Sequence, residues 1–460
     1  MEKIVIIGAG VAGVNAATKL VDNGYDGNKI TIIDMGKSPY ERLPEEVMEG
    51  FLGAGGWSDG KLTYHTAIGG HMAKYCGEDK AMELFNQVIT NFKRFHPKPE
   101  EVQCSDPQAE PDFIKPYFGL RLFPVWHVGT DYLHEIGKNW YDFLVNKGVK
   151  FIWETKVTSI DFDTQQLHTD KSTEDNDWIG YDRLIFAVGK SGIDFGKQLA
   201  DDYELTTEPK PVQIGVRFEA PQHHFQKLID ISYDFKLYRK FDNGVSLRSF
   251  CTNNNAAYVA VEQTYGDVSY NGHAKKGEEH RNNMTNFGIL MEIPGIKEPF
   301  AWSRELVETI NRNWMDSDKG IGRFARKAHS GLYYSPSRDR GVTSEGNKID
   351  AMSVTSLDVV RKAFKGYYTY IDDFIDDLKK VFPTLGDDWG VYVPEVKYLS
   401  PEPLVNYDNL SLNDYPNVHF VGDALSARGI TVSGAQGTYV AENILKKKWI
   451  KITSGLSQKN

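Results

Sequence analysis

The chain has 460 residues, a formal net charge of −10 and three cysteines, Cys76, Cys104 and Cys251. Its length predicts two domains, and its 40% hydrophobic content allows each domain a sizeable core. The acidic balance argues against a broad nucleic-acid surface, and the few cysteines favour a reducing cytoplasm and have no metal-like spacing. No apolar stretch reaches the length of a membrane span, so we expect a cytoplasmic protein with no membrane, metal or stable nucleic-acid partner.

The chain opens with a dinucleotide-binding pattern. Residues 3–7 (KIVII) are typical of a buried strand, the turn GAGVAG follows, and a second strand ends at Asp34. Gly8 allows a tight turn, Gly10 lets the backbone approach a pyrophosphate, and Gly13 lets the next helix pack on the strand. We expect the N–H groups at the start of that helix to bind phosphate. Asp34 is expected to accept hydrogen bonds from ribose hydroxyls and to repel a 2′-phosphate.

The next stretches fit the rest of such a domain. A glycine-dense loop, FLGAGGWSDGKL, occupies residues 51–62, and residues 75–100 have apolar positions at helical spacing. A further helix is predicted to start near Thr130-Asp131 and run to Val145. Strands are predicted at residues 151–162, 165–169 and 183–188, which together suggest a β-meander and a return strand.

The pattern changes at about residue 211. The stretches VQIGVRFEA, DFKLYRKF, VSLRSFCT and AAYVAVEQTY read as successive strands separated by polar breaks. Helices are predicted at residues 302–315 and 367–381. These elements predict an antiparallel sheet in a second domain. No second G-x-G-x-x-G follows a strand, so a separate NAD(P)H domain is not expected.

Residues 417–434, NVHFVGDALSARGITVSG, predict a second anchor for the cofactor. A strand ends at Gly422-Asp423, and a helical stretch begins after a small-residue turn. An acid at a strand end can bond ribityl hydroxyls, and N–H groups at a helix start can face the flavin edge that becomes negative on reduction. An FAD is longer than an NAD and needs such an anchor. We therefore predict that the cofactor is FAD and that residues from both ends of the chain bind it.

These motifs resemble those of the glutathione-reductase structural class of two-dinucleotide-binding flavoproteins. More narrowly, the chain resembles bacterial uncharacterised FAD-dependent dehydrogenases, also described as NAD(P)/FAD-dependent oxidoreductases. The stretches that carry the narrower resemblance are GGWSDGKL (55–62), HVGTD (127–131), IGVRFEAPQ (214–222) and GDALSARGITVSGAQG (422–437). AVGKSG (187–192) is similar to the A-x-G element near the flavin, and PEVKYLSPEP (394–403) to the segment that returns to the FAD domain. The family often has a cysteine-, proline- and glycine-rich stretch after a strand like residues 247–251, whereas this chain reads SFCTNNNAAY there and only Cys251 remains.

The predicted fold is α/β, with a Rossmann-like FAD-binding domain and a second α+β substrate domain. The FAD-binding domain has a parallel sheet with a β-meander and spans residues 1–205 and 400–450, with a helical insertion at about 75–120. The substrate, or cap, domain spans 206–399 and has the antiparallel sheet. The residues expected to bind FAD are Gly8, Gly10, Gly13, Asp34, Gly55, Gly56, Ser58, Lys61, Val157, Ala187, Gly189, Gly422, Asp423, Gly429 and Ile430.

Three cations are candidates for catalysis. Lys61 either stabilises the reduced, anionic flavin or contacts phosphate or solvent. Arg428 either binds a substrate carboxylate or pairs with an acid of its own loop. Arg217 faces either the flavin or solvent. Ser58 and Asp59 either contact the cofactor or cap the next element.

The leading hypothesis is an FAD-dependent oxidoreductase that transfers a hydride between a small organic substrate and flavin N5, with NAD(P)H as a transient partner left open. The alternatives are a flavin-dependent monooxygenase, which shares this layout, and a flavoprotein that acts in nucleotide or RNA modification. The acidic charge weighs against the last alternative. The substrate, the electron partner and the oligomeric state are left open.

Overall fold

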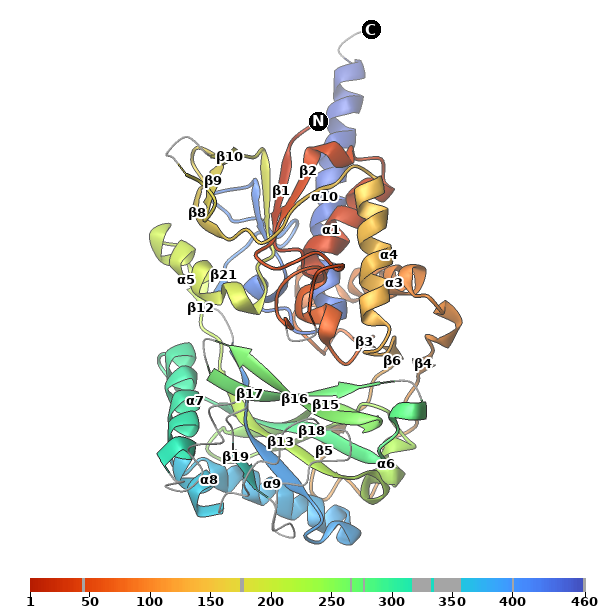
Figure 1. Cartoon of the computed structure of the whole chain (residues 1–460), viewed down its shortest axis with the longest axis vertical. Coiled ribbons are helices and arrows are strands. Elements are labelled where there is room, and N and C mark those ends of the chain that lie inside the picture. The colour runs from red at the N-terminus through yellow and green to blue at the C-terminus, as the bar shows by residue number, and fades with distance from the viewer. Residues whose placement is uncertain are drawn as a thin grey trace.

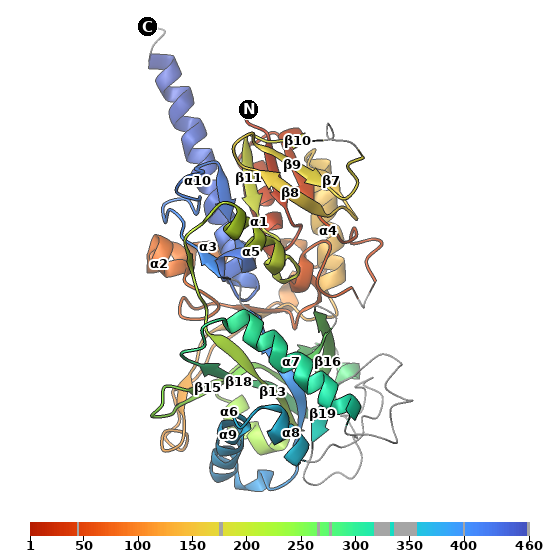
Figure 2. The same cartoon turned by 90° about the vertical axis from the view of Figure 1, so that its left-hand side faces the viewer.

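The computed structural model describes residues 1–43, 46–173, 178–264, 267–275, 278–316, 332–334, 357–398 and 401–457. Figure 1 shows two bodies stacked along the long axis of the molecule, and Figure 2 shows the same arrangement from the side. A parallel sheet lies in the body that holds both termini, and an antiparallel sheet lies in the other. The predicted fold class is therefore confirmed.

The first body is built on a five-stranded parallel sheet with the order β22-β11-β1-β2-β7. Its strands are β1 (Ile4–Ile7), β2 (Ile30–Ile33), β7 (Lys150–Ile152), β11 (Arg183–Phe186) and β22 (Val418–Phe420). Its helices are α1 (Val11–Asp22), α2 (Met72–Cys76), α3 (Glu78–Phe95), α4 (Leu133–Asn146), α5 (Ile193–Asp202) and α10 (Ile430–Ser457). The strands other than β7 are buried along their whole length, because helices cover the sheet.

Three small sheets complete the first body. The β-meander consists of β8 (Val157–Asp161), β9 (Gln166–Thr169) and β10 (Ile179–Gly180). The other two sheets are formed by β3 (Lys61–Thr63), β4 (Cys104–Ser105) and β6 (Val125–His127), and by β12 (Thr207–Glu208) with β21 (Glu402–Pro403). The strand expected at 151–162 is two strands, because the backbone turns at Glu154, whose φ is 50°. As a result, β7 joins the parallel sheet and β8 joins the meander.

The second body is built on a seven-stranded antiparallel sheet with the order β19-β20-β13-β18-β15-β14-β5. Its strands are β5 (Gly119–Arg121), β13 (Val212–Pro221), β14 (Lys236–Lys240), β15 (Ser246–Asn255), β18 (Met284–Ile293), β19 (Leu332–Tyr334) and β20 (Gly390–Lys397). Its helices are α6 (Gln226–Ile229), α7 (Pro299–Asp316), α8 (Leu357–Ala363) and α9 (Tyr368–Val381). The hairpin of β16 (Ala257–Thr264) and β17 (Asp267–Ala274) lies on the side of this body that faces the first body (Figure 1).

One segment differs from the expected organisation. The helical insertion expected at about 75–120 ends as a helix at Phe95, and the chain then crosses to the second body. Strand β5 forms an edge of the antiparallel sheet by pairing with β14. Ile114, Phe118 and Leu120 are buried in the core of the second body. The segment between α3 and α4 therefore contributes to both bodies.

Across the described ranges, every helix is too short or too polar to cross a lipid bilayer. Within the same ranges, His, Cys, Asp and Glu side chains do not gather in groups of three or more that suit a metal ion.

Candidate functional site

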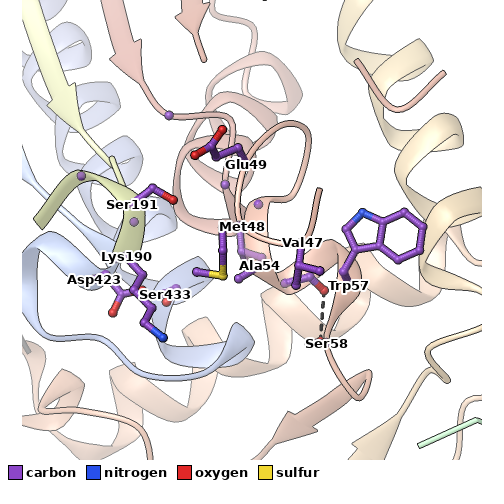
Figure 3. Close-up of a pocket in the computed structure, with 18 of the residues that line it drawn as sticks. Val47, Met48, Glu49, Ala54, Trp57, Ser58, Lys190, Ser191, Asp423 and Ser433 are labelled. Atoms are coloured by element: carbon purple, nitrogen blue, oxygen red, sulfur yellow. Dashed lines mark hydrogen bonds between the residues drawn. The ribbon is translucent and has the colours of Figure 1, made fainter. Parts of the chain in front are cut away.

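A cavity of about 560 Å³ lies between the two bodies and is lined by both. The first body contributes residues from segments 7–12, 33–35, 47–61, 155–157, 187–195 and 422–433. The second body contributes Glu262 and residues from segments 250–251, 270–273 and 395–397. Figure 3 shows Lys190, Ser191 and Asp423 on one side of this cavity and Val47 and Trp57 on the other. The wall therefore contains residues from the start of the chain, from the turn at Gly422-Asp423 (the late acidic turn) and from strands of the antiparallel sheet.

The glycine turn between β1 and α1 forms a cradle at one end of the cavity. Gly8 has a φ of +103°, and a Cβ there would lie 2.3 Å from the backbone oxygen of Ala187. A Cβ on Gly13 would lie 2.2 Å from the backbone oxygen of Gly8, so α1 packs closely on the strand end. Gly10 caps α1 without a side-chain hydrogen bond, and a Cβ on it would meet no protein atom within 4 Å. This open, uncapped helix start suits a diphosphate.

Asp34, at the end of β2, organises the loops around this cradle. Its Oδ2 accepts a hydrogen bond from the backbone N–H of Ala9 at 2.7 Å. Its Oδ1 accepts from the N–H groups of Gly36 at 2.7 Å and Gly50 at 2.8 Å. A carboxylate has about four acceptor positions, so one remains for a ligand hydroxyl. Glu49 also lines the cavity, and burial together with the charge of Asp34 raises the pKa of Glu49.

The late acidic turn lies in the same wall as the glycine cradle. Gly422 and Asp423 belong to a short 3₁₀ turn, Gly422–Leu425, and α10 begins at Ile430. Arg428 forms an ion pair with Asp423, with 2.8 Å between Nη1 and Oδ1, and also donates to the backbone oxygen of Tyr398. Arg428 therefore pairs with an acid of its own loop, which is one of the two expected alternatives. Its side chain also lines the cavity.

Lys61 belongs to a buried chain of alternating charges that joins the two bodies. Its Nζ lies 2.9 Å from Oδ2 of Asp59 and 3.6 Å from Oδ2 of Asp234, and its side chain is 4% exposed. Lys236 pairs with Asp234 at 3.1 Å, and the Cys251 thiol donates to Asp59 at 2.8 Å. Lys61 therefore contacts acids and the wall of the cavity, and it is not solvated.

Electrostatics hold this chain of charges in its ionised form. Burial alone would lower the pKa of Lys61, but Asp234 and Asp59 raise it well above its ordinary value. Burial alone would raise the pKa of Asp59, but the charge of Lys61 and the hydrogen bonds from Cys251 and Lys61 hold it well below its ordinary value. Burial and the nearby Asp59 raise the pKa of the Cys251 thiol, so the thiol form is favoured.

Arg217 lies behind the cavity wall. Its side chain is fully buried, its Nη1 lies 3.3 Å from Oε2 of Glu395, and it donates to the backbone oxygens of Phe250 and Cys251. A Cβ on Gly272 would lie 1.5 Å from Nη2 of Arg217, so the guanidinium packs beneath that glycine. Arg217 is thus neither on a solvated face nor on the cavity surface, and it supports the strands that carry the wall.

The cavity brings together most of the residues that the sequence suggested for FAD. Those in its wall are Gly8, Gly10, Asp34, Gly55, Ser58, Lys61, Val157, Ala187, Gly189, Gly422, Asp423, Gly429 and Ile430. Gly13 and Gly56 are not in the wall, and each is closely packed against neighbouring protein atoms. Ser58 donates to the backbone oxygen of Gly55 at 3.1 Å, the contact dashed in Figure 3.

The cavity also contains residues that the sequence analysis did not select. Lys190 pairs with Glu262 across the two bodies. His273, on β17, lines the cavity, and burial lowers the pKa of its ring. Lys397, at the end of β20, lines it as well. Lys190 directly follows the A-x-G element, so that motif could have identified it from the sequence. His273 and Lys397 lie on strands, and the sequence does not show which face of each strand meets the cavity.

The donor set and the shape of the cavity fit FAD. A helix start for the diphosphate and acids for the ribose lie at one end, and Asp423 and the start of α10 lie in the same continuous wall. Groups of the kind that could anchor both halves of an extended dinucleotide therefore lie in one wall.

A match to a protein family supports this conclusion. Residues 2–208 match the pyridine nucleotide-disulphide oxidoreductase family. No curated protein matches the chain. Among solved structures, similarities include a flavoprotein/dehydrogenase from Cytophaga hutchinsonii, with a TM-score of 0.42 and 13% identity over 97% of this chain and 79% of that one. An L-proline dehydrogenase from P. horikoshii has a TM-score of 0.40 and 11% identity over 97% of this chain and 94% of that one. The halogenase PltM has a TM-score of 0.38 and 12% identity over 98% and 70%. These structural similarities are too low to indicate the function of this chain.

The parallel sheet, its glycine turn and the family match define a dinucleotide-binding flavoprotein. The chain is an FAD-dependent oxidoreductase, and its cofactor is FAD.

Proposed function

We propose that this enzyme transfers a hydride between a small organic substrate and FAD, within the cavity between the two bodies. The observation that supports this most is the shared wall. The same cavity is lined by Gly8, Gly10 and Asp423 of the first body and by Cys251 and His273 of the second. A substrate held by the second body would therefore meet a cofactor held by the first.

The residues of the first body have the chemistry to bind each part of the cofactor. FAD, when bound, supplies a hydride acceptor or donor at its N5. The start of α1 at Gly10 would bind the diphosphate, and Asp34 with Glu49 would orient the adenosine ribose and repel a 2′-phosphate. Asp423 would accept hydrogen bonds from the ribityl chain.

The buried charges would keep the wall rigid and exclude water from it. Asp59, Lys61 and Asp234 link the glycine loop of the first body to the second. Lys190 and Glu262 form a second link between the bodies. Ordered charges of this kind provide a preorganised field around the reacting atoms.

We further propose the division of labour between the two parts of the chain. Residues 1–205 and 400–450 would bind the cofactor, and residues 206–399 would bind the substrate, with the crossing segment around β5 as the exception. NAD(P)H remains a candidate electron partner that would enter and leave the substrate side.

The decisive experiment is an anaerobic screen of the FAD-reconstituted protein. Organic acids, alcohols, amines and NAD(P)H are added separately, and loss of the yellow flavin absorbance identifies a hydride donor. Each organic candidate is then turned over in ¹⁸O₂, with and without NAD(P)H, and the product formed from the organic compound is analysed. A two-electron-oxidised product without ¹⁸O supports the dehydrogenase, whereas incorporation of one ¹⁸O atom shows a monooxygenase. A protein that neither retains nor takes up FAD contradicts the proposal.

A further inference from the structure

The cations at the second-body end of the cavity differ in how their charges are balanced. Lys61 is paired with Asp59 and Asp234, and Lys190 is paired with Glu262. Glu395, the acid that β20 contributes to the wall, is paired with Arg217. Each of these acids is therefore already ion-paired with a cation of the protein.

Lys397 is the exception among the described residues of this end. It follows Glu395 by two residues on β20, so both side chains lie on the same face of the strand. In the described parts of the chain, no ion pair joins its ammonium to a carboxylate. Its Nζ instead lies over the ring of Phe250, 2.9 Å from the centroid. The side chain thus presents an amino group, packed against an aromatic face, to the cavity.

The surroundings of Lys397 add positive charge. Burial, then the charges of Arg428 and Arg248, place the pKa of Lys397 well below its ordinary value, and Cys251 and Glu395 do not offset this. Arg248 donates to the side-chain oxygen of Gln213, a neutral partner, at 2.9 Å. An anion placed beside Lys397 would raise this pKa, because it would stabilise the charged ammonium.

We propose that Lys397 binds an anionic group of the substrate, and that this group is a carboxylate. The inference rests on the proposed function, since it assigns the substrate class of the same cavity. A single ammonium suits a singly charged carboxylate better than a doubly charged phosphate. The anionic edge of the reduced cofactor is the other source of such a charge. We assign that edge to the start of α10 and to Arg428, which lie on the first body.

The test compares carboxylates with their neutral isosteres. Acetate and benzoate, and acetamide and benzamide, are titrated into the FAD-reconstituted protein while the flavin absorbance and the heat of binding are recorded. We expect the carboxylates to bind about tenfold or more tightly than the amides, because a charge-assisted hydrogen bond is lost with the amides. Lys397→Met should weaken carboxylate binding by about tenfold or more and leave amide binding unchanged, and Lys397→Arg should retain most of the affinity.

Lys240→Met is the matched control. Lys240 also ends a strand of the antiparallel sheet, but its side chain is exposed and outside the cavity wall. We expect this variant to bind carboxylates as the unmodified protein does. Circular dichroism and the FAD affinity of each variant report whether the fold is retained.

Two results would overturn the assignment. One is equal binding of carboxylates and amides. The other is unchanged carboxylate binding in Lys397→Met, and a lower flavin reduction potential in that variant would then show that Lys397 serves the cofactor. A failure of the proposed function is distinguishable, because it appears as absence of FAD uptake. The carboxylate titration of the cofactor-free protein by calorimetry still decides the role of Lys397 in that case.

Discussion

Lys61 shows how a single residue can join the two bodies. It comes from the glycine loop, yet it contacts Asp234 and donates to the backbone oxygen of Thr252, both in the second body. A buried charge that loses its partner is costly, because nothing else solvates it there. Removal of this lysine would leave Asp59 without its cation and Asp234 with Lys236 alone.

We therefore predict that Lys61→Met lowers the free energy of unfolding by about 3–5 kcal/mol, measured by urea denaturation. Lys115→Met is the control, because Lys115 forms an exposed ion pair with Asp112 and its side chain is 54% exposed. Its urea midpoint should not change. Similar effects of both substitutions would show that the buried chain of charges does not stabilise the protein.

Asp59 gives a prediction about acid stability. Its pKa in the folded protein lies well below its ordinary value, mainly because Lys61 and Cys251 outweigh the effect of burial. Its contribution to stability is therefore complete above the unfolded pKa of about 4 and is lost as the pH falls through the folded pKa. Between about pH 4 and pH 3, the free energy of unfolding should fall less steeply in Asp59→Asn, by about 1 kcal/mol per pH unit. Parallel slopes in urea titrations of the two proteins would contradict this.

At the scale of elements, α1 and α10 pack closely against each other in the first body. A Cβ on Gly437 of α10 would lie 2.0 Å from the backbone oxygen of Ala12 in α1. Because the first turn of α1 forms part of the cradle, the position of α10 determines where that cradle lies. The two ends of the sequence are thus coupled through packing, and the proposed FAD would couple them further.

We predict that Gly437→Ala separates these helices, destabilises the protein by about 1–3 kcal/mol and weakens FAD binding. Gly196→Ala is the matched control, because it is also a helical glycine and its Cβ would meet Phe186 only at 3.5 Å. This control should be neutral or stabilising by up to about 1 kcal/mol, owing to the higher helix propensity of alanine. FAD titration and urea denaturation of both variants test the prediction. Equal FAD affinities would contradict it.

The elements themselves were largely predictable. The glycine turn, both flanking strands and Asp34 follow a spacing that has a physical reason at each position, and the structure has them as β1, α1 and β2. The alternating strands from residue 212 onward were also visible, because each shows its own pattern and its own turn residues. The division of 151–162 was missed, since alternation alone does not reveal the turn at Glu154.

Only those site residues that belong to short sequence motifs could be predicted. The glycines and Asp423 belong to short motifs, and the structure places them in one wall. The partners of Lys61 could not be predicted, because Asp234 lies far along the chain and only the packing of the two bodies brings it near. Lys397 was not selected for the same reason: a lysine at a strand end shows its role only when the strand register and the neighbouring charges are known.

At the scale of the whole molecule, a ligand in the shared cavity should stabilise both bodies. A ligand that binds only the folded state stabilises it by about 2.7 kcal/mol at 100 times its Kd. We predict that FAD slows amide hydrogen exchange in the first turn of α1 and also in β17, which belongs to the second body. Helix α9 is remote from the cavity wall and should exchange at an unchanged rate. Protection confined to the first body would show that FAD does not contact the second.

The order of strands in the parallel sheet has a consequence for biosynthesis. Strand β22 pairs with β11 and comes from residues 418–420, and α10, which packs on α1, follows it. A ribosome must therefore synthesise the chain past residue 420 before the sheet that begins at residue 4 acquires its edge strand β22. Until then, the nascent chain carries an apolar strand edge and an uncovered face of α1, which are surfaces that promote aggregation. We expect the first body to complete its folding only after β22 and α10 have left the ribosome.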